Sequence, residues 1–273
     1  MPLRCQYCQN PDTWKMRDGK PVYYEAMVKK IERYADLFKA TGGGITFSGG
    51  ESMMQPAFVS RVFHAAKQMG VHTCLDTSGF LGASYTDDMV DDIDLCLLDV
   101  KSGDEETYHK VTGGILQPTI DFGQRLAKAG KKIWVRFVLV PGLTSSEENV
   151  ENVAKICETF GDALEHIDVL PFHQLGRPKW HMLNIPYPLE TERPVRGNET
   201  TCGRAVPVAR LHRVLNARPL NGFPILLDMR NASYCPCRRL NRWHGPIYSY
   251  AEKSSHSTRG KVVRNTTKCP SLS

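Results

Sequence analysis

The chain has 273 residues, of which 41% are hydrophobic and 23% charged, a composition typical of a soluble globular protein. It contains no run of ~18 apolar residues, so we expect no membrane span. Met1 leads directly to Arg4 and a cysteine, a pattern unlike a secretory signal. Nine cysteines, an odd number in an enzyme-like sequence, favour reduced thiols and a cytoplasmic location over a disulfide framework.

The net charge of +6 is unevenly distributed. Residues 1–190 carry 20 Lys and Arg against 25 Asp and Glu, whereas residues 191–273 carry 15 against 4. We therefore predict a domain over 1–190 and an irregular, disordered basic tail over 191–273, which a frameshift at this boundary would explain. Cys235 and Cys237 with His244 resemble a fragment of a metal site, and the basic excess would suit nucleic acid. No recognisable module supports either interpretation, so we expect no nucleic-acid partner.

Apolar spacing and turn residues predict helices and strands in alternation along the first 190 residues. Helices are expected over 21–40, 56–69, 87–91, 104–112, 118–130 and 146–160, and strands over 45–47, 71–75, 95–100, 133–140 and 166–170. This order is typical of parallel βα units that curl toward a barrel. Polar residues follow the predicted strands, where such folds place their active sites.

The first residues set two thiols three positions apart, at Cys5 and Cys8. A turn at Asn10-Pro11-Asp12 keeps this stretch from continuing as a helix. Thiolates at this spacing converge on one soft metal centre. The spacing alone leaves three interpretations open: a zinc half-site, a thioredoxin-like redox pair, and part of an iron-sulfur ligand set.

The segment from Met1 to Trp14 resembles the cluster loop of radical S-adenosylmethionine (SAM) enzymes, which reads C-x3-C-x-aromatic-C. Cys5 and Cys8 match its second and third cysteines and Tyr7 its aromatic residue, and the continuation NPDTW resembles the pyruvate formate-lyase activating enzymes. Met1 stands in place of the first cysteine, so we expect a chain that lacks its natural N-terminus. The resemblance implies a partial (β/α)6 barrel whose first strand lies ahead of Met1. It also implies a 4Fe-4S cluster and bound SAM.

Ser48-Gly49-Gly50-Glu51 directly follows the predicted strand 45–47. Paired glycines let a backbone approach a ligand closely, and a carboxylate accepts hydrogen bonds from an ammonium group. By itself the run is more often a strand-to-helix turn with a solvated glutamate than a ligand site. It resembles the GGE motif of the family, and the resemblance implies that Gly49, Gly50 and Glu51 hold the amino group of the methionine part of SAM.

Two further predicted strands end in aspartates, Asp76 followed by Thr77 and Asp99 followed by Val100-Lys101. A lone Asp at a strand end is more often a helix cap or a turn residue than part of a site. The resemblance implies that Asp76, Thr77 and Asp99 line a monovalent cation site beside SAM. It also implies that Asp99, Val100 and Lys101 contact SAM, with the Lys101 ammonium near its carboxylate.

Arg136 lies within the predicted strand 133–140, where a charge needs a partner. A structural salt bridge and a ligand contact are equally consistent with this position. His173 follows the last predicted strand, and the resemblance implies that it contacts SAM, as does Gln9, which stands where this branch often has histidine. The other cysteines of the first 190 residues lie in apolar runs and are predicted to be small core residues: Cys74, Cys96 and Cys157.

The resemblance implies an activase. A reduced cluster would split SAM to a 5′-deoxyadenosyl radical, which would abstract a hydrogen atom from a glycine of pyruvate formate-lyase (formate C-acetyltransferase). Flavodoxin or ferredoxin would supply the electron. The catalytic residues would be Cys5, Cys8, Lys101 and Arg136. One alternative is an activase of another glycyl radical enzyme, which is disfavoured because residues 9–50 contain no extra cysteines. The others are an inactive fragment and a non-catalytic zinc- or nucleic-acid-binding protein.

Overall fold

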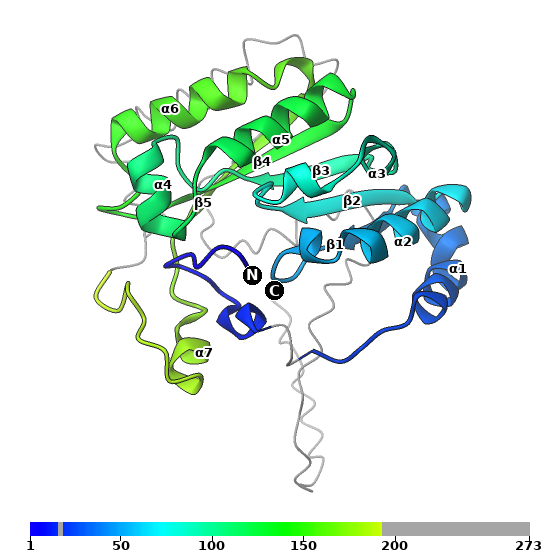
Figure 1. Ribbon diagram of the computed structural model, residues 1–273, viewed down its shortest axis with the longest axis horizontal. Coiled ribbons are helices and arrows are strands. Elements are labelled where there is room, and N and C mark those ends of the chain that lie inside the picture. The colour runs from blue at the N-terminus through cyan, green and yellow to red at the C-terminus, as the bar shows by residue number, and fades with distance from the viewer. Residues whose placement is uncertain (16–18, 193–273) are drawn as a thin grey trace, which may run out of the picture.

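The computed structural model describes residues 1–15 and 19–192, and the predictions for residues 193–273 lie outside this part of the chain (Figure 1). All five described strands join one parallel sheet in the order of the chain. They are β1 (Gly44–Phe47), β2 (His72–Thr77), β3 (Leu95–Asp99), β4 (Lys132–Leu139) and β5 (Leu164–Pro171). The alternating pattern of the sequence therefore predicted the α/β class and the parallel sheet correctly.

Helices follow the strands close to the predicted bounds. They are α1 (Tyr24–Thr41), α2 (Pro56–Gln68), α3 (Asp87–Asp91), α4 (Glu105–Thr112), α5 (Gln117–Lys128), α6 (Glu147–Glu158) and α7 (Arg177–Met182). Short 3-10 turns lie at η1 (Pro11–Trp14), η2 (Ser52–Met54), η3 (Gly82–Ser84) and η4 (Gly161–Ala163). The sequence did not predict α7, a helix of six residues whose Gly176 cap forms no side-chain hydrogen bond.

Local signals set several helix ends. Asp104 begins α4 by accepting a hydrogen bond from the Thr107 amide at 2.7 Å, and Ser146 caps α6 in the same way through the Asn149 amide. Gly42 ends α1 with a φ of 65°, a conformation in which side chains are strained. These caps explain why the sequence located the helices well.

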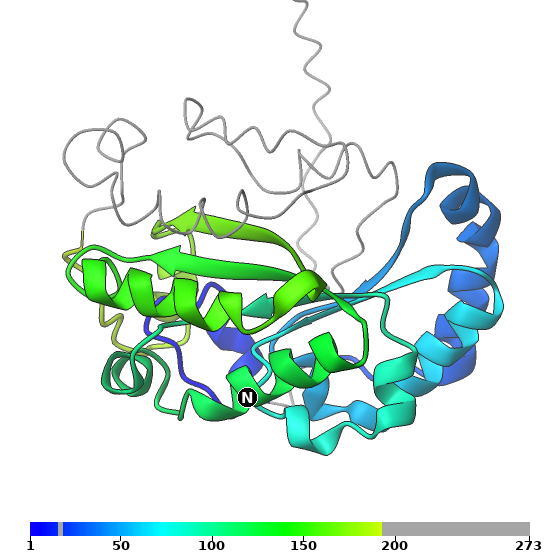
Figure 2. The same ribbon diagram turned by 90° about the horizontal axis from the view of Figure 1, so that it is seen from above.

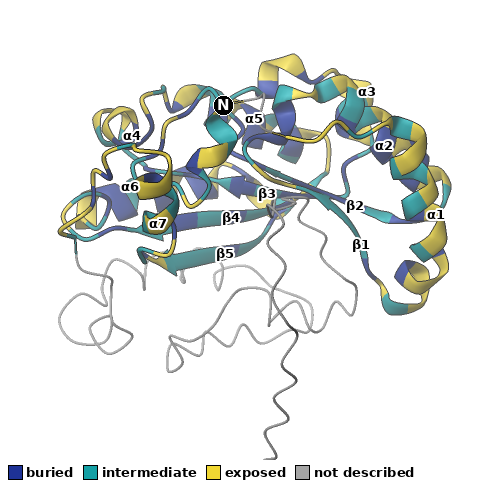
Figure 3. Ribbon diagram, turned by 90° about the horizontal axis from the view of Figure 1, so that it is seen from below, coloured by how far each residue is buried: buried dark blue, intermediate teal, exposed yellow. Residues whose placement is uncertain are grey.

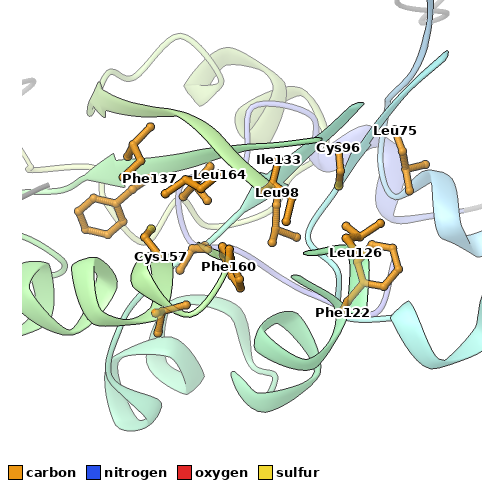
Figure 4. Packing of buried hydrophobic residues seen from close by; sticks show 14 of the residues in the cluster. Leu75, Cys96, Leu98, Phe122, Leu126, Ile133, Phe137, Cys157, Phe160 and Leu164 are labelled. Carbon is orange, nitrogen blue, oxygen red and sulfur yellow. The ribbon is translucent and has the colours of Figure 1, made fainter. Parts of the chain in front are cut away.

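The core lies between one face of the sheet and helices α2, α3, α5 and α6, which Figure 2 shows gathered on that face. Leu98 and Ile133 from the strands pack there with Phe122 of α5 and Phe160 just past the end of α6 (Figure 4). Gly123 permits this close packing, because a Cβ there would lie 2.4 Å from the Phe160 ring. Figure 3 shows the buried faces of these helices turned toward the strands and their exposed faces turned outward.

The sequential strand order and the helices on a single face give the sheet the form of an open arc. Each connection moves the chain one strand further in the same direction, which is how βα barrels are built. The structure is therefore consistent with the predicted partial barrel. The carboxyl ends of all five strands lie along one edge, and the candidate site is at this edge.

No helix among the described residues is both long enough and apolar enough to cross a membrane.

Candidate functional site

The cysteine loop is held on one side by the end of α4. The amide of Arg4 donates to the Thr112 carbonyl at 2.7 Å, and the amide of Gln6 donates to the Val111 carbonyl at 2.9 Å. The Gln6 side chain adds a bond to the carbonyl of Lys110. These bonds fix the backbone on both sides of Cys5 before any metal is bound.

On its other side the loop is held by α7 and the residues before it, and Figure 1 shows η1 beside α7. Trp180 Nε1 donates to the Cys8 carbonyl at 2.8 Å, and Lys179 Nζ donates to Asn10 Oδ1 at 2.7 Å. Gly176 lies so close that a Cβ there would be 2.8 Å from the Cys8 oxygen. A segment far away in sequence thus sets the position of Cys8.

Gln9 and His173, which the resemblance assigned to one ligand, do lie together. Gln9 Nε2 and His173 Nε2 are 3.0 Å apart. Burial lowers the pKa of His173, which favours the neutral imidazole. A neutral ring offers one donor and one acceptor, and the pair is positioned beside the cysteine loop.

The two thiols of the loop lie in a buried setting next to a positive charge. Burial raises the pKa of Cys5 to about 11, although the nearby Lys101 ammonium opposes this increase. Burial likewise raises the pKa of Cys8. The Lys101 ammonium lies 5.8 Å from the centre of the Tyr7 ring, so it links the end of β3 to the loop. Metal binding would release protons from both thiols and place their negative charge near Lys101.

The Glu51 side chain points into the protein and is only 8% exposed. Its Oε1 accepts hydrogen bonds from Thr77 Oγ1 at 2.7 Å and from the Met53 amide at 3.1 Å. Its Oε2 accepts from the Ser78 hydroxyl at 2.7 Å and from the Ser78 amide at 3.0 Å. The carboxylate therefore ties η2 to the end of β2.

The glycines before Glu51 approach the cysteine loop. Gly49 has a φ of 125°, which other residues rarely adopt. A Cβ on Gly50 would lie 2.9 Å from Thr13 Oγ1 and 3.0 Å from Met1 Sδ. Of this motif, Gly50 is the residue that lies next to the loop, whereas the Glu51 carboxylate is bonded to Thr77 and Ser78.

The charged residues at the strand ends form a connected network. Asp99 and Arg136 are paired in register across β3 and β4, and Arg136 Nε donates to Asp99 Oδ1 at 2.9 Å. The Arg136 guanidinium also forms a close ion pair with Asp76 of β2. Lys101 Nζ donates to the second Asp99 oxygen at 2.7 Å, and Ser48 Oγ donates to the second Asp76 oxygen at 2.7 Å.

This network shifts the pKa values of its two carboxyl groups in opposite directions. Burial raises the pKa of Asp76, and its one cationic partner, Arg136, only partly offsets this effect. Burial also acts to raise the pKa of Asp99, but the positive charges of Arg136 and Lys101 outweigh the effect of burial and lower this pKa overall. Asp99 is therefore the more firmly ionised of the two. Val100 follows Asp99 with its side chain in the core and its amide bonded to the Arg136 carbonyl.

Comparison with known proteins agrees with this geometry. Residues 2–155 match the radical SAM superfamily. The pyruvate formate-lyase-activating enzyme of Clostridium pasteurianum is 40% identical over 187 residues, which cover 68% of this chain and 78% of that protein. The chain belongs to the radical SAM superfamily. The pyruvate formate-lyase 1-activating enzyme of Escherichia coli K12 is 36% identical over 194 residues, which cover 70% of this chain and 78% of that protein. Within the superfamily, the chain therefore lies in the branch of the pyruvate formate-lyase-activating enzymes.

Solved structures confirm the radical SAM fold. Streptococcus suis SuiB bound to S-adenosylmethionine matches with a TM-score of 0.56 and 13% identity, covering 80% of this chain and 46% of that one. A radical SAM methyltransferase from Sphaerobacter thermophilus matches with a TM-score of 0.52 and 16% identity, covering 80% of this chain and 61% of that one. At these identities the likeness concerns the fold alone.

Radical SAM enzymes use a 4Fe-4S cluster and SAM, and such a cluster is held by three thiolates with one iron left open. Cys5 and Cys8 are the two thiols expected to contribute, and both lie in the loop. Within residues 1–15 and 19–192, no group of three or more His, Cys, Asp or Glu side chains is placed to hold a metal ion. The other cysteines there are buried in the sheet and in α6, as predicted: Cys74, Cys96 and Cys157. The described residues of this radical SAM chain thus hold two of the three expected thiols, and Met1 stands in place of the first cysteine of the pattern.

The three side chains predicted to bind a monovalent cation in this radical SAM chain do not point toward one common position. Thr77 is buried, and its hydroxyl is bonded to Glu51 and to the Gly79 amide. It points to the opposite face of β2 from Asp76, because alternate side chains of a strand face opposite ways. The guanidinium of Arg136 lies between the two aspartates. The residues present do not fit a bound cation.

Several residues that build the site were not predicted from the sequence. Gly176 and Lys179 act through contacts with residues more than 160 positions away, and no local pattern marks them. Ser48 and Ser78 bind Asp76 and Glu51. Their position directly after strands was the one available signal.

Proposed function

We propose that this chain activates pyruvate formate-lyase by forming a glycyl radical in it. The observation that carries the proposal is the packing of the loop that holds Cys5 and Cys8 beside Gly50, at the strand edge where Lys101 lies. Both curated relatives described above bear the name of pyruvate formate-lyase-activating enzymes, which supports the partner. The chemistry that the cluster and SAM supply in this superfamily is a 5′-deoxyadenosyl radical.

The chain's own residues hold the iron and orient SAM in this proposal. We assign Cys5 and Cys8 to the iron and the Gly49-Gly50 backbone to the amino group of SAM. Lys101 is already buried and positively charged, since Asp99 outweighs the effect of burial and raises its pKa. It is suited to a carboxylate ligand, and the Gln9 and His173 pair to the nucleoside part of SAM.

We further propose residues 1–190 as the radical SAM domain, a cytoplasmic location, and a flavodoxin or ferredoxin as electron donor. The match to the superfamily over residues 2–155 supports the domain. The thiols described by the structure, with no disulfide among them, suit a reducing compartment. A low-potential donor follows from the electron that radical SAM chemistry consumes.

Anaerobic reconstitution tests the proposal. The full chain and its Cys8→Ala variant are incubated with iron and sulfide, and the bound iron and sulfide are measured. SAM, a reductant and pyruvate formate-lyase are then added, and the glycyl radical is measured by electron paramagnetic resonance. Cys157→Ala is the matched control, because this thiol lies on the buried face of α6, in the core.

We expect a radical signal that Cys8→Ala abolishes and Cys157→Ala preserves. Because Met1 leaves the thiolate set incomplete, the signal should be weak in the chain as written. It should rise in Met1→Cys made with an added initiator methionine. Zinc bound without sulfide would overturn the proposal in favour of a zinc-binding protein, and so would a Met1→Cys variant that takes up a full cluster yet forms no radical.

A further inference from the structure

Each carboxylate oxygen of the two aspartates at the strand ends accepts a hydrogen bond from within the protein. Asp76 accepts from Arg136 and Ser48, and Asp99 accepts from Arg136 and Lys101, one donor for each of the four carboxylate oxygens. The side chains are mostly shielded from solvent, with exposures of 16% for Asp76, 22% for Asp99 and 23% for Arg136. An internal cation thus occupies the space between the two carboxylates.

The charges of this cluster balance without a metal ion. Asp76 and Asp99 contribute two negative charges, and Arg136 and Lys101 contribute two positive ones. A sodium or potassium ion needs several oxygen ligands, and each carboxylate oxygen it would use already accepts a hydrogen bond. The ion would also add a third positive charge next to the guanidinium in a poorly solvated place, which is unfavourable.

Arg136 is well suited to such a role. Its guanidinium is planar, permanently charged and able to donate to two carboxylates from different nitrogens. It projects from β4, and the register across β3 aligns it with Asp99, so the strand pairing itself delivers the charge to this position. It ties three neighbouring strands together at the edge where the ligand would bind.

We propose that the Arg136 guanidinium takes the place of a monovalent cation in this chain, so that Asp76 and Asp99 bind neither sodium nor potassium in the protein without SAM. The aspartates of β2 and β3 are then positioned by a side chain rather than by an exchangeable ion. This inference concerns the protein without cluster or SAM and does not depend on the proposed activase function.

Thermal unfolding of the full chain tests the inference without any cofactor. The midpoint is measured at one ionic strength in sodium chloride, in potassium chloride and in the chloride of N-methylglucamine, a cation too bulky to enter. The wild type should unfold within about 1 °C of the same midpoint in all three salts. A saturable stabilisation of the wild type by sodium or potassium would overturn the inference, and this comparison needs no variant.

Arg136→Gln leaves two carboxylates facing one lysine and should create a dependence on the cation. We expect its midpoint to fall by on the order of 10 °C in N-methylglucamine chloride, and part of this loss should return saturably with sodium or potassium. The double variant Arg136→Gln with Asp76→Asn is again balanced and should lose the dependence. Arg125→Gln is the matched control, because Arg125 pairs with Asp87, whose side chain is 93% exposed.

An Arg136→Gln variant that folds and shows no response to small cations would contradict the inference, since the freed carboxylates would then have no use for an external charge. If this variant does not fold in any salt, Arg136→Lys takes its place. Lysine restores one charge but cannot bridge both aspartates, so a smaller dependence on the cation is expected. If Arg136→Lys showed no dependence on the cation, that result would also count against the inference.

Discussion

Truncating Glu51 should destabilise the fold, because the carboxylate is the shared acceptor of buried donors. Thr77 Oγ1 at 2.7 Å and Ser78 Oγ at 2.7 Å would lose their acceptor, as would the amides of Ser78 and Met53. An unpaired buried donor costs about 1 to 3 kcal/mol, and water entering the space left by the side chain would restore some bonds. We expect Glu51→Ala to lower the free energy of unfolding by about 3 to 5 kcal/mol.

Glu51→Gln sharpens this prediction. Glutamine has nearly the same size as glutamate, but its NH2 group replaces one of the two accepting oxygens. This NH2 group is a donor and would face the donors that bond to that oxygen in the wild type. The loss should therefore be smaller, about 2 to 3 kcal/mol. Urea unfolding followed by circular dichroism measures both variants, and Glu25→Ala, on the exposed first turn of α1, is the control and should stay within about 0.5 kcal/mol of the wild type.

One result would refute the reasoning about Glu51. If Glu51→Ala unfolds within about 1 kcal/mol of the wild type while the affinity for SAM falls, the carboxylate serves the ligand rather than the fold. Affinity should be measured on protein that is still folded at the assay temperature, so that the two effects are separated.

Three more predictions follow from particular contacts. Gly176→Ala should shift the cysteine loop and reduce bound iron after reconstitution, because its Cβ would lie 2.8 Å from the Cys8 oxygen. Met1→Cys, with an added initiator methionine, should raise the iron and sulfide bound per chain, since a third thiolate completes the ligand set. Bonds from Lys67 and from a backbone amide outweigh burial and lower the pKa of Asp94, so its stabilisation is complete above the unfolded pKa of about 3.9 and is lost as the pH falls below it. Asp94→Asn should therefore make acid unfolding less steep in that range.

Each of these has a control and an opposing outcome. Gly19→Ala meets no atom within 4 Å and should leave iron binding unchanged; equal iron in Gly176→Ala would mean that the loop adapts. Met1→Ser adds no thiolate, and if it takes up as much iron as Met1→Cys, the ligand argument fails. Asp36→Asn alters a fully exposed carboxylate, and the role of Asp94 is refuted if both variants show the acid profile of the wild type.

The sequence by itself was sufficient for the fold class and for all of the described strands and α-helices except α7. Periodic apolar residues, caps such as Asp104 and breakers such as Gly42 act over a few residues, so they can be read locally. The spacing of Cys5 and Cys8 left several interpretations open, and the resemblance of the segment from Met1 to Trp14 and of the GGE motif to known sequences pointed to the correct superfamily. Parallel strands bring their carboxyl ends to one edge, which is why motifs far apart in the chain were expected to meet.

The tertiary structure decided what these side chains do when they meet. Alternation along β2 gives Asp76 and Thr77 opposite faces, but only the packed sheet shows that Thr77 binds Glu51 while Asp76 binds Arg136. Trp180 donates a hydrogen bond to the Cys8 carbonyl across 172 positions of the chain, and no local sequence pattern predicts a contact between residues so far apart. Periodicity determines which face a residue occupies, whereas its hydrogen-bonding partner is determined by which other segments the fold brings to that face.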